Sequence, residues 1–118
     1  EDLVRDLARR ILEGGGYTVL TASDGGRALE IFRKDPDRID VALLDVVMPE
    51  MSGREVWERM RQIKPDLPVL FTTGYSRNFI QSNFILEENL SLIKKPFIRS
   101  QLLREIREVI DEKGSAEE

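Results

Sequence analysis

The chain has no cysteine and no histidine among its 118 residues, and each absence removes a class of chemistry. Without cysteine there can be no disulfide, thiolate zinc site or cysteine nucleophile. Without histidine there can be no Ser-His-Asp triad, no histidine metal cluster and no phosphohistidine in this chain. Any chemistry must therefore come from carboxylates, lysines, hydroxyls or a bound metal. The lack of cysteine fits a cytoplasmic protein, which is the location we expect.

Long apolar runs and basic blocks are also missing. No apolar run approaches the roughly 18–20 residues needed to span a bilayer, so no membrane contact is expected. The net charge is −4 and no cluster of Lys and Arg stands out, which argues against direct binding of nucleic acid. The length suits one domain, which we place at residues 1–111, followed by a polar tail at 112–118.

Hydrophobic periodicity predicts an alternation of helices and short strands. The opening segment, 3–12, repeats apolar residues at helical spacing, and three consecutive glycines are expected to end that helix. Strands are predicted at 17–21, 39–44, 69–73 and 90–93, and further helices at 28–32, 56–63, 79–87 and 102–110. This order indicates an α/β protein whose parallel strands are covered by helices on both faces.

Three of the predicted strands end on polar residues that can carry chemistry: Asp45, Thr73 and Lys95. In open parallel sheets ligands bind beyond the carboxyl ends of the strands, so these side chains are expected at one edge. The carboxylate can accept a phosphoryl group or bind a metal, the hydroxyl can donate a hydrogen bond, and the ammonium can pair with negative charge. Each residue alone has an ordinary explanation as a helix cap, a strand former or a solvated lysine. The three together favour a functional site.

Three motifs of the sequence resemble those of two-component response-regulator receiver domains. Residues 44–53, Leu-Asp-Val-Val-Met-Pro-Glu-Met-Ser-Gly, are similar to the phosphoacceptor loop of that family. Thr73-Gly74 and Lys95-Pro96-Phe97 match its other two signatures, and the similarity runs from about Leu3 to Ile110. The resemblance implies a flavodoxin-like doubly wound parallel sheet with strand order 2-1-3-4-5.

The resemblance also implies roles for particular residues. Asp45 would be phosphorylated by a histidine kinase or a phosphotransfer protein with Mg²⁺, and the domain would switch a partner-binding surface without being an enzyme. Thr73 would be the switch hydroxyl and Lys95 the lysine that pairs with the phosphoryl group. Asp45 and the backbone carbonyl of Val47 would be metal ligands. A cis peptide bond is expected between Lys95 and Pro96.

The family's first strand, which ends in an acidic pair, has no counterpart in this sequence. The remaining acidic metal ligands are therefore expected upstream of Glu1, while Glu1 and Asp2 are expected to cap the first helix. The missing strand is central in the family order, so strands 17–21 and 39–44 would have no shared neighbour. Either the sequence omits residues of the real protein, or another chain donates the strand in a homodimer or strand exchange, or the module is permuted or degenerate.

A second departure lies near the lysine motif. Receivers often carry Tyr or Phe three residues before the lysine, and this chain has Leu92 there, which puts aromatic-linked signalling in doubt. Variants of this kind resemble receivers of hybrid sensor histidine kinases.

Three other functions compete with that of a receiver domain. A phosphohydrolase with a strand-end aspartate nucleophile would carry a second Asp two residues later, where this chain has Val47. A degenerate receiver would bind partners without phosphorylation; Asp45, Thr73 and Lys95 argue against it, and the missing acidic pair argues for it. A nucleotide-binding fold would need a phosphate-cradling glycine loop, which is absent.

Overall fold

The computed structural model describes residues 2–48, 50–74, 84–85, 87–88 and 90–117. The elements are, in chain order, α1 (Asp2–Gly14), α2 (Gly25–Lys34), the short 3-10 helix η1 (Pro36–Arg38), β1 (Ala42–Asp45), α3 (Gly53–Ile63), β2 (Val69–Thr73), β3 (Ser91–Lys94) and α5 (Arg99–Glu117). Most of the helix predicted at 79–87 lies outside the described residues, although Phe84 and Ile85 are helical. α5 continues to Glu117, so the last residues described are helical.

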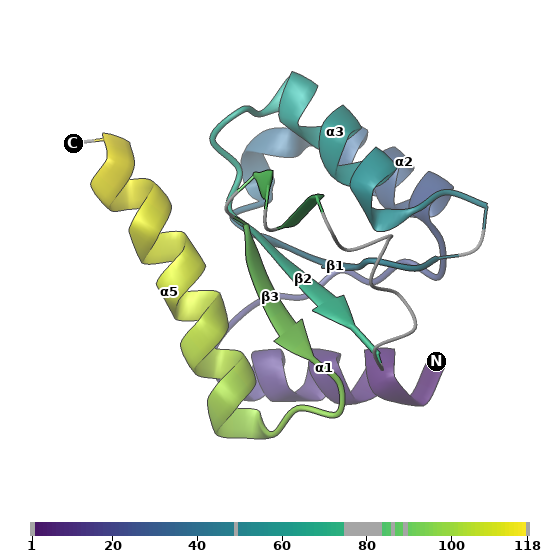
Figure 1. Cartoon of the computed structure of the whole chain (residues 1–118). Helices are drawn as coiled ribbons and strands as arrows, with labels where there is room; N and C mark the ends of the chain where they lie inside the picture. Colours follow the sequence, from purple (N-terminus) through teal and green to yellow (C-terminus); the bar gives the residue numbers. More distant parts are fainter. Residues whose placement is uncertain (1, 49, 75–83, 86, 89, 118) are drawn as a thin grey trace.

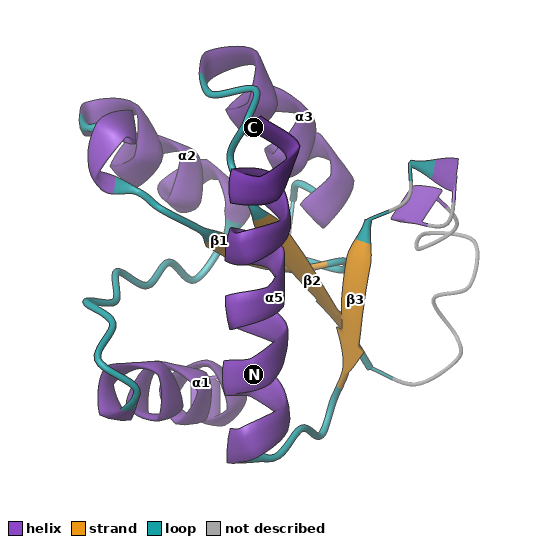
Figure 2. Ribbon diagram, turned by 90° about the vertical axis from the view of Figure 1, so that its left-hand side faces the viewer, coloured by secondary structure: helices purple, strands orange, loops and turns teal. Residues whose placement is uncertain are grey.

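The three strands form one parallel sheet in the order β1-β2-β3. Helices α1 and α5 pack on one face of this sheet, and α2 and α3 pack on the other (Figures 1 and 2). β2 is the central strand and is buried throughout. The predicted α/β class with helices on both faces of a parallel sheet is therefore confirmed.

The two faces of the sheet are each apolar because neighbouring residues of a strand point in opposite directions. Phe71 on β2 joins the cluster under α2 and α3, whereas Leu70, one residue earlier, joins the cluster under α1 and α5. Both side chains are fully buried. This double coverage explains why the strands read as continuous apolar runs rather than as alternating patterns.

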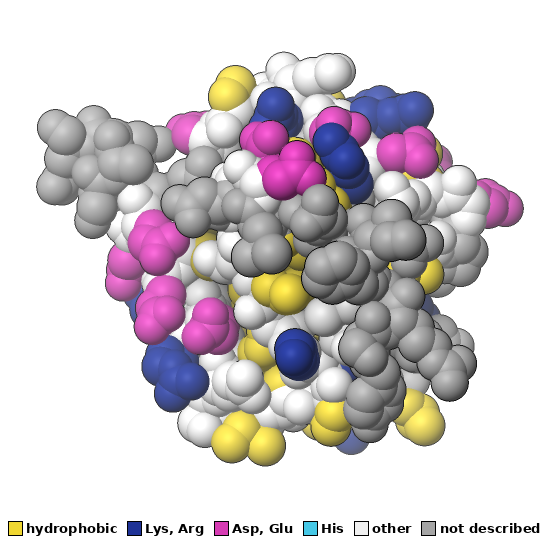
Figure 3. Space-filling model, viewed as in Figure 1, with side chains coloured by type: hydrophobic (Ala, Val, Ile, Leu, Met, Phe, Trp, Pro, Cys, Tyr) yellow, Lys and Arg dark blue, Asp and Glu magenta, His cyan; other side chains and the backbone are white. Residues whose placement is uncertain are grey.

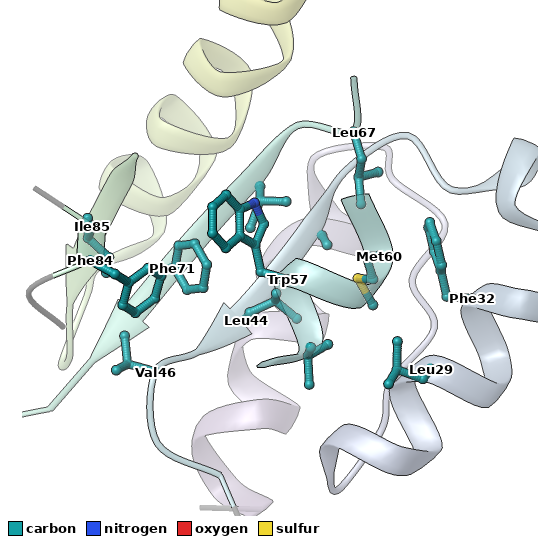
Figure 4. Packing of buried hydrophobic residues seen from close by; sticks show 13 residues of the cluster. Leu29, Phe32, Leu44, Val46, Trp57, Met60, Leu67, Phe71, Phe84 and Ile85 are labelled. Carbon is teal, nitrogen blue, oxygen red and sulfur yellow. The ribbon is translucent and has the colours of Figure 1, made fainter. Parts of the chain in front are cut away.

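Aromatic side chains fill the end of the core beneath α3. Trp57 contacts the rings of Phe71 and Phe84, with centroids 6.2 and 5.9 Å away, and Phe71 meets Phe84 edge-on at 5.1 Å (Figure 4). The guanidinium of Arg61 lies over the Trp57 ring at 4.4 Å from its centroid. These contacts fix α3 against β2, the strand beside the one that carries Asp45.

The helix ends follow the expected local chemistry. Gly16 has a φ of +98°, and Tyr17 N–H donates back to the carbonyl of Leu12 at 3.0 Å, so the glycines end α1 as predicted. α2 begins after Asp24, whose Oδ1 accepts a hydrogen bond from Arg27 N–H at 2.8 Å.

Ser52 caps α3, which is the helix that follows the Asp45 loop. Its Oγ accepts a hydrogen bond from Glu55 N–H at 3.3 Å. Ser52→Ala is therefore expected to cost about 1 kcal/mol of stability, measured as a lower urea midpoint. Ser23→Ala is the matched control, because Ser23 is exposed and the cap beside it is Asp24. Equal midpoint shifts in the two variants would contradict the capping role.

The strand predicted at 17–21 is wrong. Residues 17–22 run as a loop from α1 to α2 (Figure 2). A strand is held by the hydrogen bonds of a neighbour, and within the described chain β1 pairs with β2 alone. The β-branched composition of 17–21 therefore has no ladder to join, as expected from the missing central strand.

The surface carries charges of both signs. On the face shown in Figure 3, acidic side chains gather over α5, and acidic and basic side chains mix above α3. Within the described residues, no helix is both long enough and apolar enough to cross a membrane.

Candidate functional site

The carboxyl ends of the three strands lie at one edge of the sheet, as predicted. Asp45 is the last residue of β1 and is in register with Thr72 of β2. Thr73 ends β2 and is in register with Lys94, the last residue of β3. Lys95 follows directly. Parallel pairing thus places the three predicted residues on adjacent strand ends.

Asp45 and Lys95 form an ion pair although they are 50 residues apart in sequence. Lys95 Nζ donates to Asp45 Oδ2 at 2.6 Å. The side chain of Lys95 is 15% exposed and that of Asp45 is 26% exposed. This charge-assisted contact is short and partly shielded from water, which strengthens it relative to a surface pair.

The second oxygen of the Asp45 carboxylate is also held. Oδ1 accepts a hydrogen bond from the backbone N–H of Val47 at 3.1 Å. The carboxylate is therefore oriented by one contact from its own loop and one from across the sheet. It keeps access to solvent beside the exposed Val47 side chain.

Lys95 is fixed by its backbone as well as by its side chain. Its N–H donates to the carbonyl of Thr73 at 2.8 Å. The Lys95–Pro96 peptide bond is cis, as predicted, and Phe97 next to it is buried in the core. Thr73 itself is 7% exposed and is joined to this arrangement through the same backbone contact.

Gly53, the first residue of α3, has a packing role that sequence reasoning missed. Its N–H donates to the carbonyl of Val46 at 2.9 Å, which draws the helix start against the end of β1. A Cβ at position 53 would lie 2.2 Å from the backbone oxygen of Asp45. The available signal was a glycine directly after the Ser52 cap, in the loop segment that follows the strand-end Asp45. The close approach itself is a tertiary contact that the sequence does not display.

A metal at this edge would find oxygen ligands, but few from the described residues. Mg²⁺ prefers six oxygen ligands and is commonly bound by one or two carboxylates, phosphate oxygens and water. Within the described part of the chain, no group of three or more acidic, histidine or cysteine side chains is placed to hold a metal ion. The Asp45 carboxylate fits such a site only in part, and Glu1, predicted to cap the first helix, lies outside the described residues.

Leu92, which stands where receivers often have an aromatic residue, is half-buried on β3 and packs against the cluster under α2 and α3. The residues directly after Gly74, beginning with Tyr75, lie outside the described residues.

Comparison with known proteins points to one family. The family described as the response regulator receiver domain matches residues 1–107. The chain is 34% identical over 111 residues to the sensor kinase CckA of Brucella abortus, covering 94% of this chain and 12% of that protein. It is 32% identical over 101 residues to the response regulator receiver protein CpdR of the same organism, covering 86% of this chain and 82% of that protein.

Solved structures of receiver domains also resemble this chain. The crystal structure of a response regulator receiver domain protein from Clostridium thermocellum has a TM-score of 0.87 and 27% identity, covering 98% of this chain and 92% of that chain. A CheY-like receiver domain protein from Methanospirillum hungatei has a TM-score of 0.86 and 29% identity, covering 98% and 91%. The fold is therefore of the flavodoxin-like type. This chain belongs to the response regulator receiver domain family.

Proposed function

We propose that Asp45 accepts a phosphoryl group from a histidine kinase or a phosphotransfer protein. One observation carries the proposal: a partly exposed carboxylate ends β1, and Lys95 Nζ lies 2.6 Å from its Oδ2. Receiver domains are signalling domains of two-component systems and not enzymes in their own right. Two relatives bear names from such systems, a sensor kinase and a response regulator receiver protein, which supports this class of donor.

The transfer needs an oriented nucleophile and a way to offset charge. A carboxylate oxygen of Asp45 attacks the phosphorus of a phosphohistidine on the donor. The new P–O bond forms as the P–N bond breaks, and the released imidazole takes up a proton. The hydrogen bond from Val47 N–H to Oδ1 restricts the rotation of the carboxylate, which favours a single direction of attack.

Lys95 supplies fixed positive charge to the phosphorylated state. Its ammonium pairs with Asp45 before transfer and can pair with a phosphoryl oxygen afterwards, because the added group places more negative charge at the same edge. The backbone bond from Lys95 to Thr73 keeps the base of the lysine in place during this exchange. Such preorganised charge lowers the barrier without a large rearrangement.

We assign the Asp45 carboxylate and the Val47 backbone carbonyl as two ligands of Mg²⁺ and propose that acidic residues beyond the described ones complete the set. When bound, the metal would neutralise part of the charge on the phosphoryl oxygens.

The response of the domain is proposed to pass through Thr73. Its hydroxyl, at the end of β2 and near the carboxyl edge, is the group we assign to hydrogen-bond the new phosphoryl oxygens. An inward movement of this hydroxyl would shift the segment after Gly74 and with it a partner-binding surface. A small bias between two existing conformers is sufficient for such a switch.

The direct test is intact mass before and after incubation with acetyl phosphate and Mg²⁺. We would compare this chain with a form extended upstream of Glu1 by an apolar strand that ends in two acidic residues. A gain of one phosphoryl group by either form supports the acceptor function, and a gain by the extended form alone places missing metal ligands on that strand. No gain by either form, with acetyl phosphate or with a phosphorylated histidine kinase, would favour the phosphorylation-independent interaction module.

Lys95→Met is expected to slow phosphoryl incorporation about tenfold or more, because a hydrogen bond to a charged group is worth roughly 1.5–3 kcal/mol. The matched control is Lys94→Met, since Lys94 is the preceding residue and is exposed. The measurement is the time course of phosphorylated mass with the extended form. Equal slowing in both variants would argue against a specific contact between Lys95 and the phosphoryl group.

A further inference from the structure

An open pocket of about 330 Å³ lies at the amino ends of the strands, at the edge of the sheet opposite Asp45. Its lining includes Val69 and Ser91, the first residues of β2 and β3, and Glu112 of α5. The carboxyl end of α5 lies on the side from which the strand arrows start (Figure 1). The pocket is therefore separate from the proposed phosphorylation site.

The floor of this pocket is apolar. Leu67, Val69 and Val109 line it, and each is at most 6% exposed. Pro65 and Pro68, from the turn between α3 and β2, extend the apolar surface toward the opening. A ligand gains most from such a floor when it brings an apolar portion of its own, because water is then released from both surfaces.

Trp57 supplies a polar group to the pocket. The residue is 7% exposed, and the guanidinium of Arg61 covers one face of its ring. The indole nitrogen lies on the edge of the ring that points away from Phe71 and Phe84 (Figure 4). Among the described residues the indole N–H has no acceptor, and no polar side-chain atom is sealed in the core without one, so this N–H opens to the pocket. A ligand that offers an oxygen there would satisfy a nearly buried donor.

Three charged side chains line the pocket. Arg61 and Glu88 pair with each other, with Nη1 and Oε1 3.8 Å apart. Glu112 is exposed and forms no ion pair with any residue that the structure describes. The lining therefore has a net charge of −1, and the carboxylate of Glu112 remains available to a ligand. This charge favours a cation in the pocket and disfavours a carboxylate.

We propose that this pocket binds an arginine side chain carried by an apolar peptide segment of a partner protein. A backbone carbonyl of the peptide accepts from the N–H of Trp57, the methylene groups of the arginine lie on the apolar floor, and its guanidinium pairs with Glu112. The planar guanidinium can bond both oxygens of one carboxylate, which the ammonium of a lysine does less well. Free arginine is a poorer ligand, because Glu88 and Glu112 would repel its own carboxylate.

The first test is a fluorescence titration of the 118-residue chain, in which Trp57 is the single tryptophan and its emission reports on the pocket. The peptide acetyl-Leu-Arg-Leu-amide should change this emission saturably, with a Kd below about 1 mM. The same peptide with citrulline, the neutral isostere of arginine, should bind at least about fivefold more weakly, because its contact with Glu112 is uncharged. Free arginine should bind at least about tenfold more weakly than the peptide. Equal affinity for all three ligands would overturn the proposal.

Two matched variants test the ion pair. Glu112→Gln should weaken binding of the arginine peptide about fivefold and leave binding of the citrulline peptide unchanged. Glu108→Gln is the control, because Glu108 is exposed on α5 one turn earlier and does not line the pocket. Both substitutions change the net charge of the chain equally, so a general attraction of the cationic peptide would respond alike in both. Equal effects of the two substitutions would refute the proposed contact.

The indole N–H of Trp57 provides a second readout, since one tryptophan gives one indole signal in an NMR spectrum of the nitrogen-labelled chain. On addition of the arginine peptide this signal should move to lower field, and its proton should exchange more slowly with water, because the N–H gains an acceptor. Binding that leaves the indole signal unmoved would place the peptide elsewhere and refute the proposal. No phosphodonor is present in these experiments, so failure here would leave the assignment of Asp45 untouched.

Discussion

Asp45→Asn is expected to abolish the gain of one phosphoryl group that acetyl phosphate and Mg²⁺ produce. The substitution keeps the size of the side chain but replaces the nucleophilic carboxylate with a neutral amide. The amide oxygen can still accept from Val47 N–H, so the loop has a means of keeping its shape. The contact with Lys95 is lost as an ion pair, because the amide is uncharged.

Asp40→Asn is the matched control for this prediction. Asp40 is exposed and lies five residues earlier in the same chain segment, ahead of β1. It should gain the phosphoryl group at the rate of the unsubstituted chain, whereas Asp45→Asn should gain none in the same time. Incorporation by Asp45→Asn at the unsubstituted rate would show that another residue is the acceptor. A circular dichroism spectrum matching that of the parent chain excludes unfolding as the cause of a loss.

Much of the fold could be predicted because a parallel α/β protein has local sequence patterns, namely apolar runs for its strands and helical spacing of apolar residues for its helices. The apolar runs that end on Asp45 and Thr73 predict two strands. Because a helix connects them, the strands are parallel and their carboxyl ends lie at the same edge of the sheet. That geometry brought Lys95 within 2.6 Å of Asp45 across 50 residues of sequence. The sequence could place these residues at one edge, but not the ion pair itself, since a side-chain contact depends on packing around both groups.

The segment 17–21 shows where local patterns fail. Its composition favours a strand, yet β propensity describes how well residues fit into a pleated surface with neighbours. Within the described chain no strand lies between this segment and β1, and a groove takes that place. The family order predicts the missing neighbour, whereas the residues of 17–21 by themselves do not reveal that they lack a pairing partner. Residues 17–21 form a loop because they have no strand to pair with, and strand pairing depends on the whole sheet rather than on local composition.

The Asp45 loop depends on a close approach that admits only glycine at position 53. The added methyl group of Gly53→Ala would meet the backbone oxygen of Asp45 at 2.2 Å, and both the carbonyl carbon of Asp45 and the Cα of Val46 at 3.0 Å. These are backbone atoms, so no side-chain rotation relieves the overlap. The hydrogen bond from Gly53 N–H to the Val46 carbonyl would have to lengthen as the helix start moves away. Overpacking of this kind costs about 3 kcal/mol.

We therefore expect Gly53→Ala to lower Tm by about 10 °C and to slow phosphorylation of Asp45 as well, because the displaced backbone is that of the acceptor. Gly26→Ala is the control: it is a helical glycine near the start of α2, and a Cβ there would meet only Asp24 Oδ1, at 3.4 Å. Alanine is the better helix former, so this variant should be unchanged or stabilised by up to about 1 kcal/mol. Equal melting temperatures for the two variants would mean that α3 can shift without cost. A fall in Tm with an unchanged phosphorylation rate would separate the stability of the loop from the orientation of its carboxylate.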